Sequence, residues 1–326
     1  MRRSARSRSA TAFAPGHITG FFRPEVSSRD PRARGSVGAG LVLELGVRVR
    51  ARWTPRGSHR IVVRTDSAQD VPISREVARR LFARGSGRLE VWVRNELPVG
   101  QGFGTSAAGA LATGLAVGRL LGVPRQRAIA VAHLADLHGL GGLGGVAAIL
   151  GGGLESRRRA GIPPYGVVRH QPFPHPVTIA VLGRPLPSPR VLGDPKWLRR
   201  VDLAARPGLE TFRRGLGPEG FLREAERFSD AVALGPESVS RKVRSLRRPG
   251  LFVAQTMFGR AIWAVATRRR ARERLVAELE RHRVAAVELR PAKSGPLVAL
   301  EWGSHRARIP GHSSRRRYPR AARRTP

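Results

Sequence analysis

The first half of the chain alternates segments that have the hydrophobic pattern of strands with segments that have the pattern of helices. Strand-like patterns, in which apolar residues tend to occupy every second position, cover residues 41–49, 60–63 and 89–93. Helix-like patterns cover residues 74–83, 106–121 and 124–138. Pro124 suits the first turn of the last helix and Gly122 suits the end of the one before it, so the predicted bounds agree with local chemistry.

The second half mixes the same two patterns after a proline-rich connector over residues 162–176. Strands are predicted at residues 177–182, 284–289 and 297–302, and a strand–turn–strand unit at residues 251–266. Helices are predicted near residues 208–216, 219–234, 237–247 and 270–282. No internal repeat is present, so the chain is not a solenoid or propeller.

A glycine loop, Pro98-Val99-Gly100-Gln101-Gly102-Phe103-Gly104, joins a predicted strand to the small-residue helix that starts near Thr105. Glycines tolerate positive φ, and the first turn of a helix offers free N–H groups and the positive end of its dipole. The loop therefore predicts a polyphosphate site. It lacks the lysine of a Walker A motif and the spacing of a dinucleotide fingerprint. A purely structural strand-to-helix turn is the alternative.

Composition narrows the class of protein. The chain has 326 residues, 41% of them hydrophobic, which suffices for one large core or two moderate ones. It has no cysteine, which excludes disulfides and thiol catalysis and fits a cytoplasmic enzyme. No apolar run reaches the roughly 20 residues that a membrane helix needs, and no apolar segment follows the basic N-terminus, so we expect neither a membrane protein nor a secreted one.

The chain is strongly basic, with 60 Lys and Arg residues against 23 Asp and Glu and a formal net charge of +37. A nucleic-acid-binding protein would have such a charge. The arginines are spread along the whole chain, however, which favours the codon bias of a GC-rich genome. Arginine is also dense at the two ends, where residues 1–10 and 304–326 predict a disordered arm and a disordered tail with weak, non-specific adhesion to nucleic acid.

Several motifs in order resemble those of the GHMP kinase superfamily, and within it the archaeal pantoate kinases. Residues 12–22 (AFAPGHITGFF) are similar to the family's opening motif, and residues 35–40 (GSVGAG) to the turn on its substrate side. The glycine loop resembles the family's phosphate loop, Ala132–Asp136 its helix with an acidic residue, and residues 142–148 its central glycine turn. Residues 152–157 follow that turn, and residues 255–259 are a weaker match to a third glycine motif.

The resemblance implies an α+β fold with an N-terminal nucleotide-binding half, residues 11–165, and a ferredoxin-like C-terminal half, residues 177–303. It implies ATP and Mg²⁺ as cofactors, with ATP held by the phosphate loop. In this sequence those residues are Pro98, Gly100, Gly102, Phe103, Gly104, Thr105, Ser106, Ala107 and Ala108. It implies pantoate as the substrate, and it is compatible with a homodimer.

Ser106 and Asp136 are the candidate magnesium ligands. The resemblance places the Ser106 hydroxyl on a phosphate oxygen or on the metal, whereas sequence alone equally allows an ordinary helix cap. Members of the family carry an acidic residue at the position of Asp136, and Asp reaches less far than Glu. A solvated acid on the surface of a helix is the alternative for Asp136.

Arg157, Ser36 and His17 are the candidate substrate-binding residues. Arg157 matches a family arginine and suits a carboxylate or the transferred phosphoryl group, because its planar fork binds such groups in a bidentate manner. Arg158 and Arg159 adjoin it, so its register is ambiguous. His17 lies in the opening motif and suits a hydrogen bond to the substrate, although a lone histidine is more often structural.

Two positions depart from the family pattern. Gly145 stands where pantoate kinases carry the aspartate that is the presumed base, and Val37 stands where an arginine is expected. Phosphoryl transfer depends mainly on positioning and charge stabilisation, so the loss of a base is expected to slow the reaction by about 10²–10⁴-fold. On this basis Gly145→Asp is predicted to raise turnover.

The leading hypothesis is phosphorylation of pantoate to 4-phosphopantoate for coenzyme A synthesis. The alternatives are a kinase of another small hydroxy acid and a non-catalytic paralogue that binds nucleotide or RNA.

Overall fold

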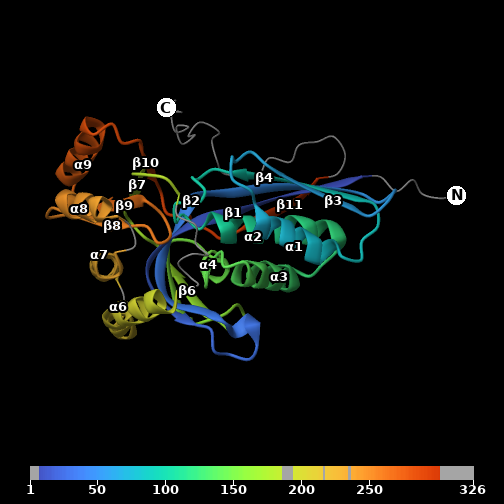
Figure 1. Cartoon of the computed structure of the whole chain (residues 1–326), viewed down its shortest axis with the longest axis horizontal. Coiled ribbons are helices and arrows are strands. Elements are labelled where there is room, and N and C mark those ends of the chain that lie inside the picture. Colours follow the sequence, from blue (N-terminus) through green and yellow to red (C-terminus); the bar gives the residue numbers. More distant parts are fainter. Residues whose placement is uncertain (1–6, 186–193, 216, 234–235, 302–326) are drawn as a thin grey trace.

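The computed structural model describes residues 7–185, 194–215, 217–233 and 236–301. Most of the predicted arginine-rich arm and all of the predicted tail lie outside these residues. The described chain forms two β-sheets with helices packed on them (Figure 1). None of the described helices is long and apolar enough to span a bilayer.

The larger sheet contains seven strands. Five follow the order β11-β1-β2-β4-β3, and β5 pairs with both β2 and β6. Only the β3–β4 pair is parallel, and helix α1 makes the crossover that a parallel pair requires. The strands are β1 (Arg8–Glu25), β2 (Gly35–Thr54), β3 (Arg60–Thr65), β4 (Arg88–Asn95), β5 (Leu154–Arg159), β6 (Val167–Gln171) and β11 (Leu297–Glu301).

Helices cover one face of the larger sheet (Figure 1). Helix α2 lies centrally against β1 and β2, and nearly all its residues are buried, since Ala and Gly along it allow close packing from every side. A helix that is buried on all sides needs no polar face, and α2 accordingly consists almost entirely of small and apolar residues. The helices of this layer are α1 (Pro72–Phe82), α2 (Thr105–Leu121), α3 (Arg125–His138) and the short α4 (Gly145–Ala148); a 3₁₀ turn, η1 (Pro31–Ala33), joins β1 to β2.

The smaller sheet has the strand order β10-β7-β9-β8. Helices α8 and α9 pack on one face of this sheet, and α6 and α7 lie over the other face and against β1. The strand order together with α8 and α9 makes a ferredoxin-like unit. This confirms the predicted α+β class. The elements are β7 (Val177–Val181), α6 (Pro195–Arg214), α7 (Pro218–Val232), α8 (Glu237–Leu246), β8 (Leu251–Gln255), β9 (Ala261–Ala266), α9 (Arg269–Arg281) and β10 (Ala286–Leu289).

The structure adds elements that the pattern did not predict. Strand β1 contains Pro15, Gly16 and Pro24 and does not read as a strand, yet it starts at Arg8, inside the range assigned to the arm. Strand β6 lies within the predicted connector, and α6 begins thirteen residues before the predicted helix at residue 208. Tertiary pairing with β2 and β5 overrides the weak local signals of β1 and β6.

The two halves are not separate in space. Strand β11, the last of the range assigned to the C-terminal half, returns to pair with β1 in the larger sheet. One core cluster contains Ile18 and Leu41 from the larger sheet together with Phe221 and Trp263 from the C-terminal elements. Phe221 lies against Gly20, where an added Cβ would approach its ring to 2.3 Å.

We expect Phe221→Ala to lower the free energy of unfolding by about 3–5 kcal/mol, because it removes a fully buried aromatic ring at the junction of the two halves. Leu203→Ala is the matched control, since Leu203 on α6 is 59% exposed and its loss should change stability by about 0.5 kcal/mol at most. Urea denaturation of both variants measures the difference. Equal stabilities would contradict a shared core.

Candidate active site

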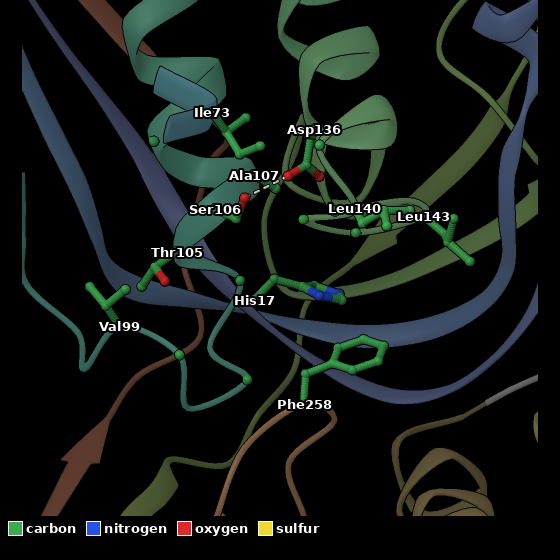
Figure 2. A pocket seen from close by; sticks show the side chains of 18 of the residues that line it. His17, Ile73, Val99, Thr105, Ser106, Ala107, Asp136, Leu140, Leu143 and Phe258 are labelled. Carbon is green, nitrogen blue, oxygen red and sulfur yellow. Dashed lines mark hydrogen bonds between the residues drawn. The ribbon is translucent and has the colours of Figure 1, made fainter. Parts of the chain in front are cut away.

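A cavity of about 280 Å³ lies where the larger sheet, the helix layer and the β8–β9 turn meet. Its walls come from segments far apart in the sequence, namely β1, β2, the start of α1, the glycine loop, α2, α3, the central glycine turn, β5 and the β8–β9 turn. Figure 2 shows labelled side chains from β1, α1, the glycine loop, α2, α3, the central glycine turn and the β8–β9 turn around one space. The cavity therefore unites the motifs that the sequence singled out.

The glycine loop has the conformation that the sequence predicts. Gly100, Gly102 and Gly104 have φ values of 72°, 79° and 66°. Helix α2 begins at Thr105, with Gly104 as its cap residue and no side chain capping it. The first N–H groups of α2 are thus left for a ligand at the positive end of the helix dipole, which is a binding site for an anion.

Backbone contacts from two other segments hold this loop in place. The His17 N–H on β1 donates to the Phe103 carbonyl at 3.0 Å. The β8–β9 turn packs closely on the loop. A Cβ at Gly259 of the turn would lie 2.3 Å from the backbone of Gln101 in the loop, and a Cβ at Gly102 of the loop would lie 2.0 Å from the carbonyl of Met257 in the turn. Residues 255–259, the weak third motif, therefore act as a glycine-dependent support for the phosphate loop.

Ser106 and Asp136 form a pair at the entrance to α2. The Ser106 hydroxyl donates to Asp136 Oδ1 at 2.7 Å (Figure 2). Asp136 is 2% exposed, which is incompatible with a solvated surface acid, and Ser106 lies inside the helix and does not cap it. Burial raises the pKa of Asp136 to about 7, and the hydrogen bond from Ser106 opposes this shift.

The donor atoms at this pair fit magnesium. Mg²⁺ prefers oxygen ligands and is commonly held by one or two carboxylates, with substrate phosphates and water completing its shell. Ser106 and Asp136 supply a hydroxyl and a carboxylate beside the anion-binding helix terminus, and both line the cavity. Within the described residues there is no group of three or more His, Cys, Asp or Glu side chains suited to a metal. A metal here would depend on a bound polyphosphate for further ligands.

The opposite side of the cavity holds a buried network that includes a residue the sequence analysis missed. Glu155 Oε1 accepts hydrogen bonds from His17 Nε2 at 2.9 Å and from Arg157 Nη1. All three residues are at least 96% buried. Burial lowers the pKa of His17, and the hydrogen bond and charge of Glu155 oppose that shift. One signal could have revealed Glu155, because residues two apart on a strand share a face and Glu155 precedes Arg157 by two.

Arg157 presents an unused donor next to Ser36. Its Nε is buried and has no hydrogen-bond partner among the described residues. A Cβ at Gly144 would lie 3.2 Å from this Nε and 2.5 Å from Ser36 Oγ, so both groups lie directly against the central glycine turn. A guanidinium donor and a hydroxyl at the wall of a cavity suit a small carboxylate.

The structure resolves the register of the three consecutive arginines. Arg157 faces the cavity, whereas Arg158 is exposed and lies over the Phe212 ring, with its Cζ 5.1 Å from the ring centroid. Arg159 bonds to the carbonyls of Pro164 and Tyr165. Val37 belongs to the apolar core and does not line the cavity, although its neighbour Ser36 does.

Not every residue of the predicted phosphate loop reaches the cavity. Gly100, Gly102, Gly104 and residues 105–107 line it, whereas Pro98, Phe103 and Ala108 do not. The Phe103 ring is 1% exposed and anchors the loop in the core, so it contributes packing and its backbone carbonyl. Further apolar residues line the cavity that were not predicted as site residues, among them Phe22, Val71, Pro72, Ile73, Val93, Val99, Leu140, Leu143, Met257 and Phe258. No local pattern distinguishes these from ordinary core residues.

Gly145 begins α4, and its surroundings leave no space for a side chain. A Cβ at this position would lie 2.6 Å from the Ala107 Cβ on α2. The φ of Gly145 is not positive, so the obstacle is packing and not backbone conformation. This finding revises the expectation that an aspartate here would raise turnover.

We expect Gly145→Asp by itself to lower both stability and nucleotide affinity, because α4 must move away from α2 to admit the new Cβ. The double variant Gly145→Asp, Ala107→Gly removes the clashing methyl at a cost of about 1 kcal/mol in helix stability. Thermal melting and calorimetry with Mg-ATP should show that the double variant binds more tightly than the single one. Unchanged stability in Gly145→Asp would contradict the steric account.

Comparisons with known proteins agree with this site. Residues 72–153, from α1 through α4, match the family model of the GHMP kinases N terminal domain. A pantoate kinase from Thermococcus kodakarensis is 33% identical over 267 residues, which cover 78% of this chain and 86% of that protein. A solved phosphotransferase related to the CoA biosynthesis pathway is similar with a TM-score of 0.78 and 29% identity, over 89% of this chain and 98% of that one. A mevalonate-3-kinase from Thermoplasma acidophilum, solved with mevalonate 3-phosphate and ADP bound, shares the fold with a TM-score of 0.60 and 14% identity, over 91% of this chain and 99% of that one.

Proposed function

This chain belongs to the pantoate kinase family within the GHMP kinases, and from that premise we propose its reaction and the role of each group in the cavity. It transfers the γ-phosphoryl group of ATP to the primary hydroxyl of pantoate and forms 4-phosphopantoate, a step of coenzyme A synthesis. The observation that carries the proposal is that one cavity has two different binding ends. One end is the anion-binding start of α2, and the other is the buried Arg157 with a free Nε donor.

ATP occupies the side of the cavity nearest α1 and β4. The triphosphate lies along the glycine loop and the first turn of α2, where backbone N–H groups bind its oxygens. Beyond the loop, the cavity wall is largely apolar, with two polar side chains, and such a lining suits a nucleobase and its ribose. The apolar residues are Val71, Ile73, Val93 and Val99, and the polar ones are Gln69 and Asn95.

Ser106 and Asp136 hold the magnesium ion that accompanies ATP. When bound, Mg²⁺ neutralises charge on the phosphate oxygens during transfer. Asp136 contributes its carboxylate to this cation, which favours the ionised form of a group that is otherwise buried with only a serine hydroxyl. The Ser106 hydroxyl fixes the orientation of that carboxylate.

Pantoate fits the opposite side of the cavity through its two distinct ends. Arg157 Nε and Ser36 Oγ bind the carboxylate next to the central glycine turn. The two methyl groups on the central carbon of pantoate contact the apolar wall of Phe22, Leu143 and Phe258. The carboxylate contact orients the molecule so that its primary hydroxyl faces the phosphate loop.

An ADP-release assay with a panel of hydroxy acids tests the proposed substrate. Pantoate should be turned over best, and 2,4-dihydroxybutanoate, which lacks both methyl groups, should lose about 10–200-fold in kcat/KM because the apolar wall is left unfilled. A different acid as the best substrate would support the alternative of another hydroxy-acid kinase. Binding of Mg-ATP without turnover of any acid would contradict the proposal and favour a non-catalytic nucleotide-binding protein.

Arg157→Lys and Arg158→Ala form a matched pair for the carboxylate contact. Arg157→Lys keeps a cation beside Glu155 but loses the free Nε, so we expect the KM for pantoate to rise by on the order of 10-fold or more, with Mg-ATP affinity unchanged. Arg158→Ala alters only an exposed neighbour and should leave both values within about two-fold. Steady-state kinetics checks this, and equal effects at the two positions would remove Arg157 from the substrate site.

Ser106→Ala should weaken Mg-ATP binding by on the order of 10–100-fold, because Asp136 loses its only side-chain hydrogen-bond partner among the described residues and is no longer held toward the metal. Ser245→Ala on α8 is the control, since this exposed hydroxyl bonds only to the Lys242 carbonyl, away from the cavity. Isothermal calorimetry with Mg-ATP measures both. Identical affinity in Ser106→Ala and in the unmodified protein would exclude Ser106 from the nucleotide site.

A further inference from the structure

Transfer of a phosphoryl group to an alcohol requires that the alcohol lose its proton. Four titratable side chains line the described cavity: His17, Asp70, Asp136 and Arg157. Asp70 is exposed and paired with Arg75 at 2.6 Å, Asp136 is engaged with Ser106 beside the phosphate loop, and Arg157 is a permanent cation. His17 is therefore the group in this cavity with a proton-accepting atom available on the substrate side.

The fold directs the His17 ring into the cavity. His17 lies on the short stretch of β1 between two register shifts, at Pro15/Gly16 and at Thr19/Phe21, and such bulges re-aim side chains next to active sites. Its ring lies against Gly40 on β2, where a Cβ would come within 2.3 Å of Nε2. In Figure 2 the ring projects between the Ser106–Asp136 pair and the Phe258 ring.

Glu155 fixes the tautomer of this histidine. An ionised carboxylate only accepts hydrogen bonds, so the 2.9 Å contact means that His17 Nε2 carries the proton and donates it to Glu155 Oε1. The lone pair then resides on Nδ1. Among the described residues no group is hydrogen-bonded to Nδ1, and His17 lines the cavity, with its backbone and Cβ next to Gly104 of the phosphate loop.

We propose that His17 is the general base of the reaction, with Glu155 as the positioning residue that holds its Nε2–H and leaves Nδ1 free; this rests on the proposed kinase function. Nδ1 takes the proton of the primary hydroxyl as that O–H bond breaks. The alcohol oxygen forms the new bond to the γ-phosphorus, the bond from that phosphorus to the bridging oxygen breaks, and ADP leaves with the electron pair. The imidazolium then returns its proton to water. This dyad supplies the acceptor that Gly145 lacks.

The charges around His17 are consistent with a neutral imidazole at neutral pH. Glu155 and Arg157 face it from β5 and His170 from β6, whereas β2 contributes only the Gly40 backbone. Burial keeps the pKa of His17 below its ordinary value of 6.5, and Arg157 and His170 act in the same direction while Glu155 opposes them. The Nδ1 lone pair is thus free at pH 7 and is lost only as the pH falls through the lowered pKa.

His17→Gln is the first test, with His170→Gln as its control. Glutamine retains a hydrogen bond to Glu155 but cannot take a proton, so kcat with pantoate should fall by about 10²–10⁴-fold while Mg-ATP affinity stays within about two-fold. His170 also carries a half-buried imidazole near Glu155 but does not line the cavity, so its variant should keep kcat within about three-fold. A His17→Gln kcat within three-fold of the unmodified protein would overturn the assignment.

Two further measurements separate catalysis from a structural role. Glu155→Gln removes the carboxylate whose charge and hydrogen bond raise the pKa of His17. The plateau of kcat/KM of this variant should therefore be lower, and the acid limb of its pH profile should move to lower pH. If that variant does not fold, imidazole rescue of His17→Ala tests the base instead. Added imidazole should raise the turnover of His17→Ala by at least about ten-fold, and the rescue should grow with pH as the fraction of neutral imidazole rises. A large loss of kcat without imidazole rescue would assign His17 a structural role and overturn the base. No turnover of pantoate by the unmodified protein would instead overturn the proposed function itself.

Discussion

The burial of the Glu155 carboxylate is the constraint on which the substrate side of the cavity depends. An ionised carboxylate removed from water costs several kcal/mol unless donors compensate it, and here the donors to Oε1 come from two different strands, while Oε2 is buried without a hydrogen-bond partner among the described residues. His17 on β1 and Arg157 on β5 both donate to Oε1, although β1 and β5 are separated by β2 in the sheet. The pairing fixes the orientation of both side chains at once, with Arg157 Nε left without a hydrogen-bond partner among the described residues and both side chains at the cavity wall.

Close packing of glycine backbone is the second constraint, and it determines which side chains can act. Added Cβ atoms at Gly141 or Gly144 would lie within 2.2–2.5 Å of the Ser106, Asp136 or Ser36 side-chain oxygens. Residues 140–145, where the central glycine turn begins, therefore lie directly on the functional groups, and the only side chains that they contribute to the cavity wall are those of Leu140 and Leu143. Chemistry in this cavity has to come from the strands and helices beneath the turn.

The site also couples the two halves of the molecule. The β8–β9 turn of the smaller sheet packs backbone to backbone against the phosphate loop, and Gln101 bonds to both Gly183, just after β7, and Arg260, just before β9. The apolar wall likewise takes Phe22 from the larger sheet and Phe258 from the smaller one, with their ring centroids 6.4 Å apart. A motion between the halves would thus change the phosphate loop and the substrate wall together.

The sequence by itself determined the elements whose signals are local. The period of apolar residues predicted α1, α2, α3 and the ferredoxin-like strands and helices to within a few residues, and the glycines of the loop predicted a helix that starts at Thr105. The ordered motifs also predicted the family. Positions 106, 136 and 157 were predicted as site residues because their motifs resemble those of the family, and the structure brings them to one cavity.

Only the tertiary structure decided the features that depend on contacts between distant segments. β1 is a strand because β2 and β11 flank it, in spite of its prolines and glycines. The strand spacing could place Glu155 on the same face as Arg157, but its contact with His17 became visible only once β1 and β5 were placed in the sheet, because His17 lies 138 residues away in the chain. The absence of room at Gly145 was equally hidden, since it depends on the distance between α4 and one methyl group of α2. A sequence specifies periodicity and local caps, whereas burial, partners and free volume exist only after the chain has folded.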